Sequence, residues 1–152
     1  MKTRILMVCL GNICRSPLAE GILKSKLNTA EFHVDSAGTS AIHEGELPDK
    51  RSIDVAHVNK IDITDQRSRP FLKSDLEEFD YIYVMDQSNY DNVCQLIEKE
   101  SHRQKVIMIM DEVYADASAD VPDPYYDSIN GFKNVYEMLD EACEKIASKL
   151  TK

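Results

Sequence analysis

Short apolar runs alternate along the chain with segments whose apolar residues recur every three or four positions. The runs are rich in Val, Ile, Leu, Met and Tyr, which is typical of buried strands. Runs of this kind separated by helical segments are typical of βαβ units in a mostly parallel sheet. The predicted strands are Arg4–Val8, Phe32–Ser36, Tyr81–Met85 and Lys105–Ile109.

The clearest helical pattern lies near the end of the chain, where Phe132, Val135 and Leu139 share one face that we expect to pack in the core. Ser74 and Glu77 have the spacing of a capping box, which predicts a short helix directly after Ser74. The predicted helices are Pro17–Leu27, Asp49–His57, Asp75–Glu78, Ser88–Lys99 and Gly131–Leu150.

Two segments without a clear pattern, residues 37–49 and 111–130, each follow a predicted strand. In open α/β sheets, ligands bind beyond the carboxyl ends of the strands, and functional residues gather in the loops there. We therefore expect both segments to approach the end of the first strand.

The composition narrows the class of protein. With 152 residues, 43% of them hydrophobic, the chain can fill one core, so we expect a single domain over residues 1–152. We see no apolar stretch long enough to span a bilayer and no signal-peptide pattern, and we expect a cytoplasmic monomer. A net charge of −9 argues against binding to nucleic acid or to an anionic membrane.

The cysteines and histidines do not have the spacing of metal ligands. We therefore expect no metal centre and no cofactor. In a reducing compartment the cysteines are free thiols, and Cys94 and Cys143 are expected to be core residues of helices.

The segment with the clearest chemistry runs from Cys9 to Ser16, between the first predicted strand and the first predicted helix. The backbone N–H groups of such a loop and the positive end of the helix dipole suit a phosphate-sized anion. Arg15 offers a planar fork of donors to that anion. A Cys9 thiol beside these groups should ionise readily, and the thiolate is the attacking species. Gly11 allows a positive φ or a close approach of the anion, and Asn12 tolerates left-handed backbone.

Taken one at a time, these residues are more often structural, and Ser16 also suits the N-cap of a helix that continues with Pro17. Their order and context together favour an anion site with a nucleophile. The phosphate loop of nucleotide hydrolases is excluded because no Lys-Ser or Lys-Thr follows the glycine, and the dinucleotide fingerprint is also missing. Cys14 is either a buried loop thiol or a redox partner that captures oxidised Cys9 as a disulfide.

A proton donor for a leaving group is offered by the acidic segment that precedes the last helix. Asp123 stands between Pro122 and Pro124, which restrict the backbone and can hold its carboxyl in a defined direction. Tyr125 and Tyr126 could form the wall of a cleft that receives an aromatic ring. Taken alone, such a segment is more often an exposed turn.

Four ordered motifs together resemble the low molecular weight protein tyrosine phosphatases, and the resemblance spans essentially the whole chain. They are VCLGNICRSP at residues 8–17, DSAGT at 35–39, MDQSN at 85–89 and DPYY at 123–126. The resemblance implies an α/β three-layer sandwich with a four-stranded parallel sheet flanked by helices on both faces. It also implies a protein tyrosine phosphatase that works without metal through a cysteinyl-phosphate, acts on phosphotyrosine proteins or peptides, and binds inorganic phosphate or a similar oxyanion.

The same resemblance implies roles for individual residues. Cys9 would be the nucleophile, Arg15 the phosphate clamp and Asp123 the general acid that later activates water. The remaining residues would bind phosphate (Leu10, Gly11, Asn12, Ile13, Cys14 and Ser16), support the loop (Ser36, Asp86 and Ser88) or line the cleft (Ile42, Tyr125 and Tyr126). Asn12, Ser16 and Ser36 would also form a hydrogen-bond network that shapes the loop and lowers the pKa of the thiol.

Departures from the family pattern leave alternatives open. Gln66 stands where many relatives have a His that supports the loop, and we expect it to replace that contact. Ile42 and His43 stand at the loop position where eukaryotic relatives carry an aromatic ring, and an aliphatic wall there resembles bacterial members. His43 itself is expected to be a solvated loop residue rather than a catalytic one. The branched apolar side chain of Ile13 resembles that of the tyrosine-directed members of the family, because relatives similar to arginine phosphatases carry Thr at this loop position. Arginine phosphatase, arsenate reductase and a non-catalytic redox or oxyanion sensor are the competing interpretations.

Overall fold

The computed structural model describes residues 2–115 and 119–152 of the chain. In this part, four parallel strands form one sheet in the order β2-β1-β3-β4, so β1 is a central strand. The strands are β1 (Thr3–Cys9), β2 (Phe32–Gly38), β3 (Tyr81–Val84) and β4 (Val106–Met108). The helices are α1 (Arg15–Lys26), α2 (Lys50–Val58), α3 (Asp75–Glu78), α4 (Gln87–Cys94), α5 (Glu100–Arg103), the 3₁₀ helix η1 (Ile109–Glu112) and α6 (Ile129–Leu150).

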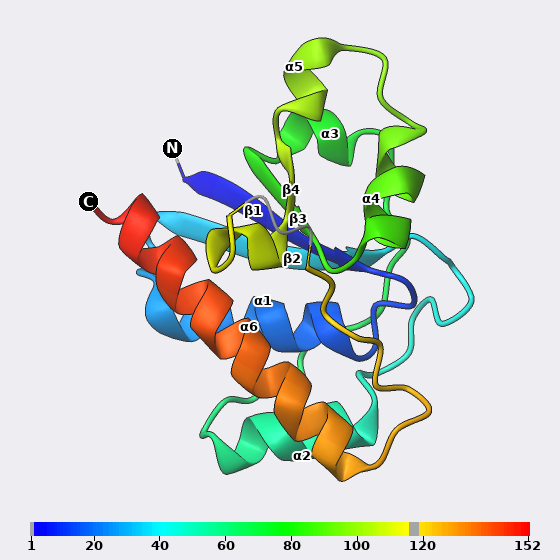
Figure 1. Ribbon diagram of the computed structural model, residues 1–152, viewed down its shortest axis with the longest axis vertical. Helices are drawn as coiled ribbons and strands as arrows, with labels where there is room; N and C mark the ends of the chain where they lie inside the picture. Colours follow the sequence, from blue (N-terminus) through cyan, green and yellow to red (C-terminus); the bar gives the residue numbers. More distant parts are fainter. Residues whose placement is uncertain (1, 116–118) are drawn as a thin grey trace.

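Helices cover both faces of the sheet (Figure 1). The alternation of side chains along β1 explains why, because successive residues point to opposite faces. Ile5 and Met7 belong to the larger buried cluster, which includes residues of α1 and α6, while Leu6 and Val8 belong to a second cluster with Leu76 of α3 and residues of α4. Helix α2 packs against α1 and α6. The predicted α/β architecture with a four-stranded parallel sheet is confirmed.

The ends of the strands differ from the predictions by a few residues. Strands β1 and β2 continue to Cys9 and Gly38, which pair with each other at the carboxyl end of the sheet. Strand β3 ends one residue early, at Val84, and β4 is shorter than predicted because Ile109 already belongs to η1. Cys9 therefore stands at the last position of a central strand, where the chain leaves the sheet.

The helix predicted over Ser88–Lys99 is too long, because α4 ends at Cys94 and the next helix, α5, begins only at Glu100. The backbone N–H groups of Leu96 and Ile97 donate to the carbonyls three residues earlier, at Val93 and Cys94. Such tight bonds end an α-helix. The last helix, in contrast, starts two residues before its predicted start, at Ile129.

The capping box predicted for α3 is also wrong. Ser74 has helical backbone angles, with φ −62° and ψ −22°, and its side chain makes no capping hydrogen bond. The carboxylate of Asp75 instead accepts the N–H of Leu72 at 2.8 Å. Ser16 is not an N-cap either, because α1 already begins at Arg15.

No helix formed by residues 2–115 and 119–152 is both long enough and apolar enough to cross a bilayer.

Candidate active site

The loop after β1 turns back on itself and leads directly into α1. Asn12 has a φ of 57°, the left-handed region that Asn tolerates better than most residues. Gly11 does not have a positive φ, so the left-handed residue of the loop is Asn12. A Cβ at position 11 would approach Cδ2 of His43 to 3.0 Å, so a larger residue there would require the His43 side chain to shift. The carbonyl of Ile13 accepts the N–H of Asp49, which ties the loop to the start of α2.

The Cys9 thiol is buried at the base of this loop, and its Sγ lies 3.0 Å from Oγ of Ser16. Nδ2 of Asn12 donates to the same Ser16 hydroxyl at 2.7 Å and to Oγ of Ser36 at 2.9 Å. The side chains of Asn12 and Ser16 do not line the pocket, as direct phosphate-binding side chains would. They lie behind its wall and fix the position of the sulfur, together with Ser36.

The side chain of Arg15 is only 2% exposed, and its charge is balanced by carboxylates on two other segments. Nη1 donates to Oδ2 of Asp86 at 2.6 Å and to the carbonyl of Val121 at 2.9 Å. Nη2 lies 3.7 Å from Oδ2 of Asp123. Burial alone would lower the pKa of Arg15, but the nearby Cys9 and Asp86 outweigh it and raise the pKa above its ordinary value. The guanidinium therefore stays charged inside the site.

Asp86 holds this arrangement by acting at two places. While Oδ2 binds Arg15, Oδ1 accepts the N–H of Asn89 at 2.8 Å, which caps α4. The structure does not bring Ser88 to the site: it is exposed on α4, and the described residues make no hydrogen bond with its side chain. The group of α4 that binds Asp86 at its first turn is the backbone N–H of Asn89, not the side chain of Ser88.

A pocket of about 270 Å³ opens above the thiol, just below the usual range for small-ligand sites. The two loops expected to approach Cys9 both contribute to its wall, as predicted. The residues that line it are Cys9, Leu10, Gly11, Ile13, Cys14, Arg15, Ser40, Ile42, His43, Asp123, Tyr125 and Tyr126. An acidic residue, a buried cation and a thiol therefore border one cavity with an apolar and aromatic rim.

The rim differs in one residue from the prediction. His43 was expected to be solvated, but it lines the pocket, and its ring centroid lies 6.2 Å from that of Tyr125. Its Nδ1 lies 3.0 Å from a carboxylate oxygen of Glu46. The rings of Tyr125 and Tyr126 meet edge to face at 5.0 Å, and Tyr126 is 97% exposed. The rim thus presents accessible aromatic surface beside Ile42.

Arg51, which the sequence did not single out, anchors the segment that carries Asp123. Its guanidinium donates to the carbonyls of Tyr125 at 2.8 Å and Asp127 at 2.9 Å. The same guanidinium binds Asp49, the N-cap residue of α2. Burial tends to raise the pKa of Asp49, but hydrogen bonds from Arg51 outweigh it and lower that pKa. The start of α2 therefore connects the Cys9 loop with the Asp123 segment.

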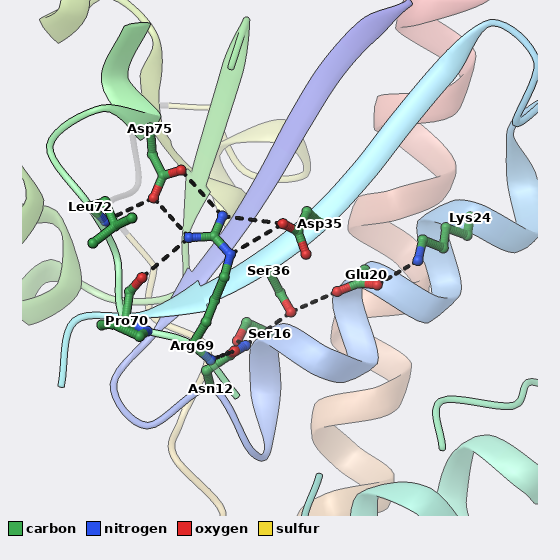
Figure 2. A network of polar contacts seen from close by, with 10 residues as sticks. All are labelled: Asn12, Ser16, Glu20, Lys24, Asp35, Ser36, Arg69, Pro70, Leu72 and Asp75. Atoms are coloured by element: carbon green, nitrogen blue, oxygen red, sulfur yellow. Dashed lines mark hydrogen bonds and ion pairs between the residues drawn. The ribbon is translucent and has the colours of Figure 1, made fainter. Parts of the chain in front are cut away.

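A polar network behind the pocket extends the contacts of Asn12 and Ser36 in two directions (Figure 2). Ser36 donates to Oε1 of Glu20 at 2.7 Å, and Lys24 donates to Oε2 of this carboxylate at 2.6 Å. Burial raises the pKa of Glu20 above its ordinary value. On the other side, the backbone N–H of Arg69 donates to Oδ1 of Asn12 at 3.0 Å.

Gln66 does not make the loop-supporting contact expected of it. Its Nε2 donates to the carbonyl of Pro17 at 3.0 Å, in the first turn of α1, and its Oε1 is buried with no hydrogen-bond partner among residues 2–115 and 119–152. The hydroxyl of Ser36 donates to Glu20, which lies four residues after Ser16 on α1. The sequence signal that could have identified Glu20 is a carboxylate four residues after the loop residue Ser16, on the buried side of a helix.

The other cysteines differ in their surroundings. Cys14 is a free, buried thiol within the loop. Burial, then the charges of Asp49 and Cys9, raise its pKa far above the ordinary value. Cys143 is fully buried on α6, as predicted, and burial also raises its pKa. Cys94 is only half-buried, so its assignment to the core was wrong.

Outside residues 1 and 116–118, no group of three or more His, Cys, Asp or Glu side chains could hold a metal ion.

Comparison with known proteins identifies the family. The family model described as low molecular weight phosphotyrosine protein phosphatase matches residues 4–152. A low molecular weight phosphotyrosine protein phosphatase of Schizosaccharomyces pombe is 38% identical over 141 residues, which cover 90% of this chain and 89% of the relative. The crystal structure of a protein tyrosine phosphatase from Entamoeba histolytica, with Hepes in its active site, is 37% identical and has a TM-score of 0.92. This match covers 99% of this chain and 97% of that one.

A structure of the YwlE arginine phosphatase with a phosphorylated active site serine is 25% identical, with a TM-score of 0.86 and coverage of 99% of this chain and 97% of that one. The fold, the site and these relatives define a cysteine-based phosphatase. Within that class, the chain belongs to the low molecular weight phosphotyrosine protein phosphatase family.

Proposed function

We propose that this protein hydrolyses phosphotyrosine in proteins or peptides through a covalent phosphocysteine on Cys9. One observation carries the proposal: the thiol of Cys9 lies at the base of a pocket that is also bordered by Arg15 and Asp123. The pocket thereby offers a nucleophile, a clamp for phosphate oxygens and a proton donor around one cavity.

In the first step, the Cys9 thiolate attacks phosphorus and the bond from phosphorus to the phenolic oxygen breaks. Arg15 and the loop N–H groups bind the equatorial oxygens as negative charge develops on them. The protonated carboxyl of Asp123 gives its proton to the departing phenolate, so the product leaves as the neutral phenol. The phosphoryl group remains on sulfur.

In the second step, water attacks the phosphocysteine, and the carboxylate of Asp123 takes the proton that this water loses. The bond from phosphorus to sulfur breaks, and the electron pair stays on Cys9 as a thiolate. A hydrogen bond from Ser16, whose Oγ is 3.0 Å from Sγ, stabilises that thiolate as a leaving group. Inorganic phosphate is the second product.

The rim of the pocket favours phosphotyrosine over phosphoarginine as the substrate. Ile42, Tyr125 and Tyr126 offer apolar and aromatic surface to a phenyl ring. Ile13 lines the same pocket and carries a branched apolar side chain near the phosphate site. Arsenate reduction would need further thiols as a relay, and neither Cys94 nor Cys143 lines this pocket.

We expect a phosphotyrosine peptide to be hydrolysed with a kcat/KM at least about tenfold higher than the same peptide carrying phosphoarginine. Ile13→Thr should narrow this ratio by making the pocket more polar. Val58→Thr makes the matched change on the exposed surface of α2 and should leave the ratio unchanged. A wild-type preference for phosphoarginine would overturn the assignment of substrate.

We also propose that Cys14 protects Cys9 from lasting oxidation. Peroxide oxidises the Cys9 thiolate to a sulfenic acid and is itself reduced to water. The Cys14 thiol then attacks the sulfenic sulfur, releasing water and forming a disulfide that a dithiol reduces back to two thiols. We expect most activity to return after peroxide and dithiothreitol in the wild type, but less than half to return in Cys14→Ala. Equal recovery in both proteins would refute this role, and Cys94→Ala is the control.

A further inference from the structure

The amide of Asn12 lies at the centre of the network behind the pocket, and its two ends are not interchangeable (Figure 2). An amide nitrogen only donates hydrogen bonds, and an amide oxygen only accepts them. Nδ2 donates both of its protons, one to Ser16 at 2.7 Å and one to Ser36 at 2.9 Å. Oδ1 accepts the backbone N–H of Arg69 at 3.0 Å. The bond from Arg69, together with the bond in which Ser36 gives its own proton to Glu20, therefore fixes which way the amide of Asn12 points.

The direction of this amide determines which atom accepts the hydroxyl proton of Ser16. Because Oγ of Ser16 already accepts from Asn12, its own proton is free to be donated to Sγ of Cys9, 3.0 Å away. With the amide reversed, two donors would meet at Arg69, and Ser16 would give its proton to Oδ1 instead. The hydroxyl oxygen would then face the sulfur with a lone pair, an arrangement that favours the neutral thiol over the thiolate.

Arg69 is held in place by its side chain and by its backbone. The guanidinium makes a two-pronged contact with Asp75, with Nη1 and Nη2 at 3.0 and 3.2 Å from separate carboxylate oxygens. Nε and Nη2 also donate to Oδ2 of Asp35 at 3.2 Å. The side chain of Asp75 is only 3% exposed, and a buried two-pronged pair of this kind is geometrically specific. The carbonyl of Arg69 accepts the N–H of Gly38 at 2.9 Å, which fixes the segment beside the end of β2.

We propose that Arg69 is a positioning residue for the nucleophile: its guanidinium, held by Asp75 and Asp35, keeps its backbone N–H on Asn12, and this bond makes Ser16 a donor to Cys9. The inference deepens the proposed function, on which it rests for the role of Cys9. Arg69 does not line the pocket and acts only through Asn12 and Ser16.

The test is the pH dependence of Cys9 alkylation by iodoacetamide, a neutral reagent that reports the thiolate without turnover. Arg69→Gln removes the two-pronged pair with Asp75 and should move the midpoint of alkylation up by about one pH unit, a tenfold loss of thiolate at pH values below the midpoint. We expect kcat/KM for an aryl phosphate to fall about tenfold. Arg69→Lys keeps the charge without the planar fork, so its shift should be smaller than that of Arg69→Gln.

Arg67→Gln is the matched control, because Arg67 is exposed and, among the described residues, donates only to the carbonyls of Thr64 and Gln66. The pH midpoint of Cys9 alkylation in Arg67→Gln should equal that of the wild type. If Arg69→Gln does not fold, Asp75→Asn takes its place, because it weakens the same pair and leaves an oxygen to accept the N–H of Leu72. An unchanged midpoint in whichever variant is folded overturns the proposal. Cys9→Ser tests the covalent mechanism separately, so the two ideas can fail independently.

Discussion

Cys9→Ser is expected to lower the hydrolysis of an aryl phosphate by at least about a thousandfold, because it removes the attacking thiolate. A serine hydroxyl at the same place is hardly ionised at neutral pH, and Ser16 is itself a hydroxyl that cannot serve as a general base for it. The loop N–H groups and Arg15 remain, so the variant should still bind inorganic phosphate with an affinity near that of the wild type. Steady-state kinetics and phosphate titration check the two parts of this prediction.

The matched control is Cys94→Ser, which makes the same change at a half-buried thiol on α4 that does not line the pocket. Its activity should stay within about twofold of the wild type. If Cys9→Ser kept wild-type activity, hydrolysis would not pass through a phosphocysteine on this residue. Loss of both activity and phosphate binding would instead mean that the loop had not kept its shape.

The sheet and the long helices could be predicted because their signals are local. Branched apolar residues mark β1, and the apolar face of α6 repeats over several turns. The errors in the predicted elements occur where tertiary contacts determine the ends of a helix or strand. The capping box at Ser74 is not formed because Ser74 has helical backbone angles, whereas a capping residue needs extended ones. The next residue, Asp75, binds Arg69 and Leu72, two contacts that a sequence pattern does not contain.

The distinction between local sequence signals and tertiary contacts also holds for the site. Cys9 and Arg15 fall within one short segment, so their pattern could be interpreted directly, whereas the role of Asp123 was predicted from the resemblance to the family and not from its flanking prolines alone. Glu20, Arg51 and Arg69 were missed because each acts through a contact with a distant part of the chain. Their partners Ser36, Asp127 and Asn12 lie 16, 76 and 57 residues away in the sequence, respectively. Such contacts follow from the topology of the sheet, in which segments far apart meet beyond the ends of the strands.

Asp123→Asn is expected to reduce activity by an amount that depends on the leaving group. With phenyl phosphate, whose phenolate is a poor leaving group, kcat should fall by about 10² to 10³ because the proton donor is gone. With p-nitrophenyl phosphate the loss should be much smaller, since nitrophenolate departs without a proton. KM should not rise, because the substitution removes a negative charge 3.7 Å from Nη2 of Arg15 and so favours anion binding.

The local structure should survive this change, which makes the kinetic result interpretable. Oδ1 of Asp123 accepts the N–H of Tyr125 at 3.1 Å, and an asparagine oxygen can accept the same bond. Asp127→Asn is the matched control, because Asp127 is exposed in the same segment and its contact with Arg51 is made by its backbone carbonyl. It should behave as the wild type with both substrates. Equal losses for the two substrates in Asp123→Asn would show that this carboxyl does not protonate the leaving group, because only that step distinguishes a poor leaving group from a good one.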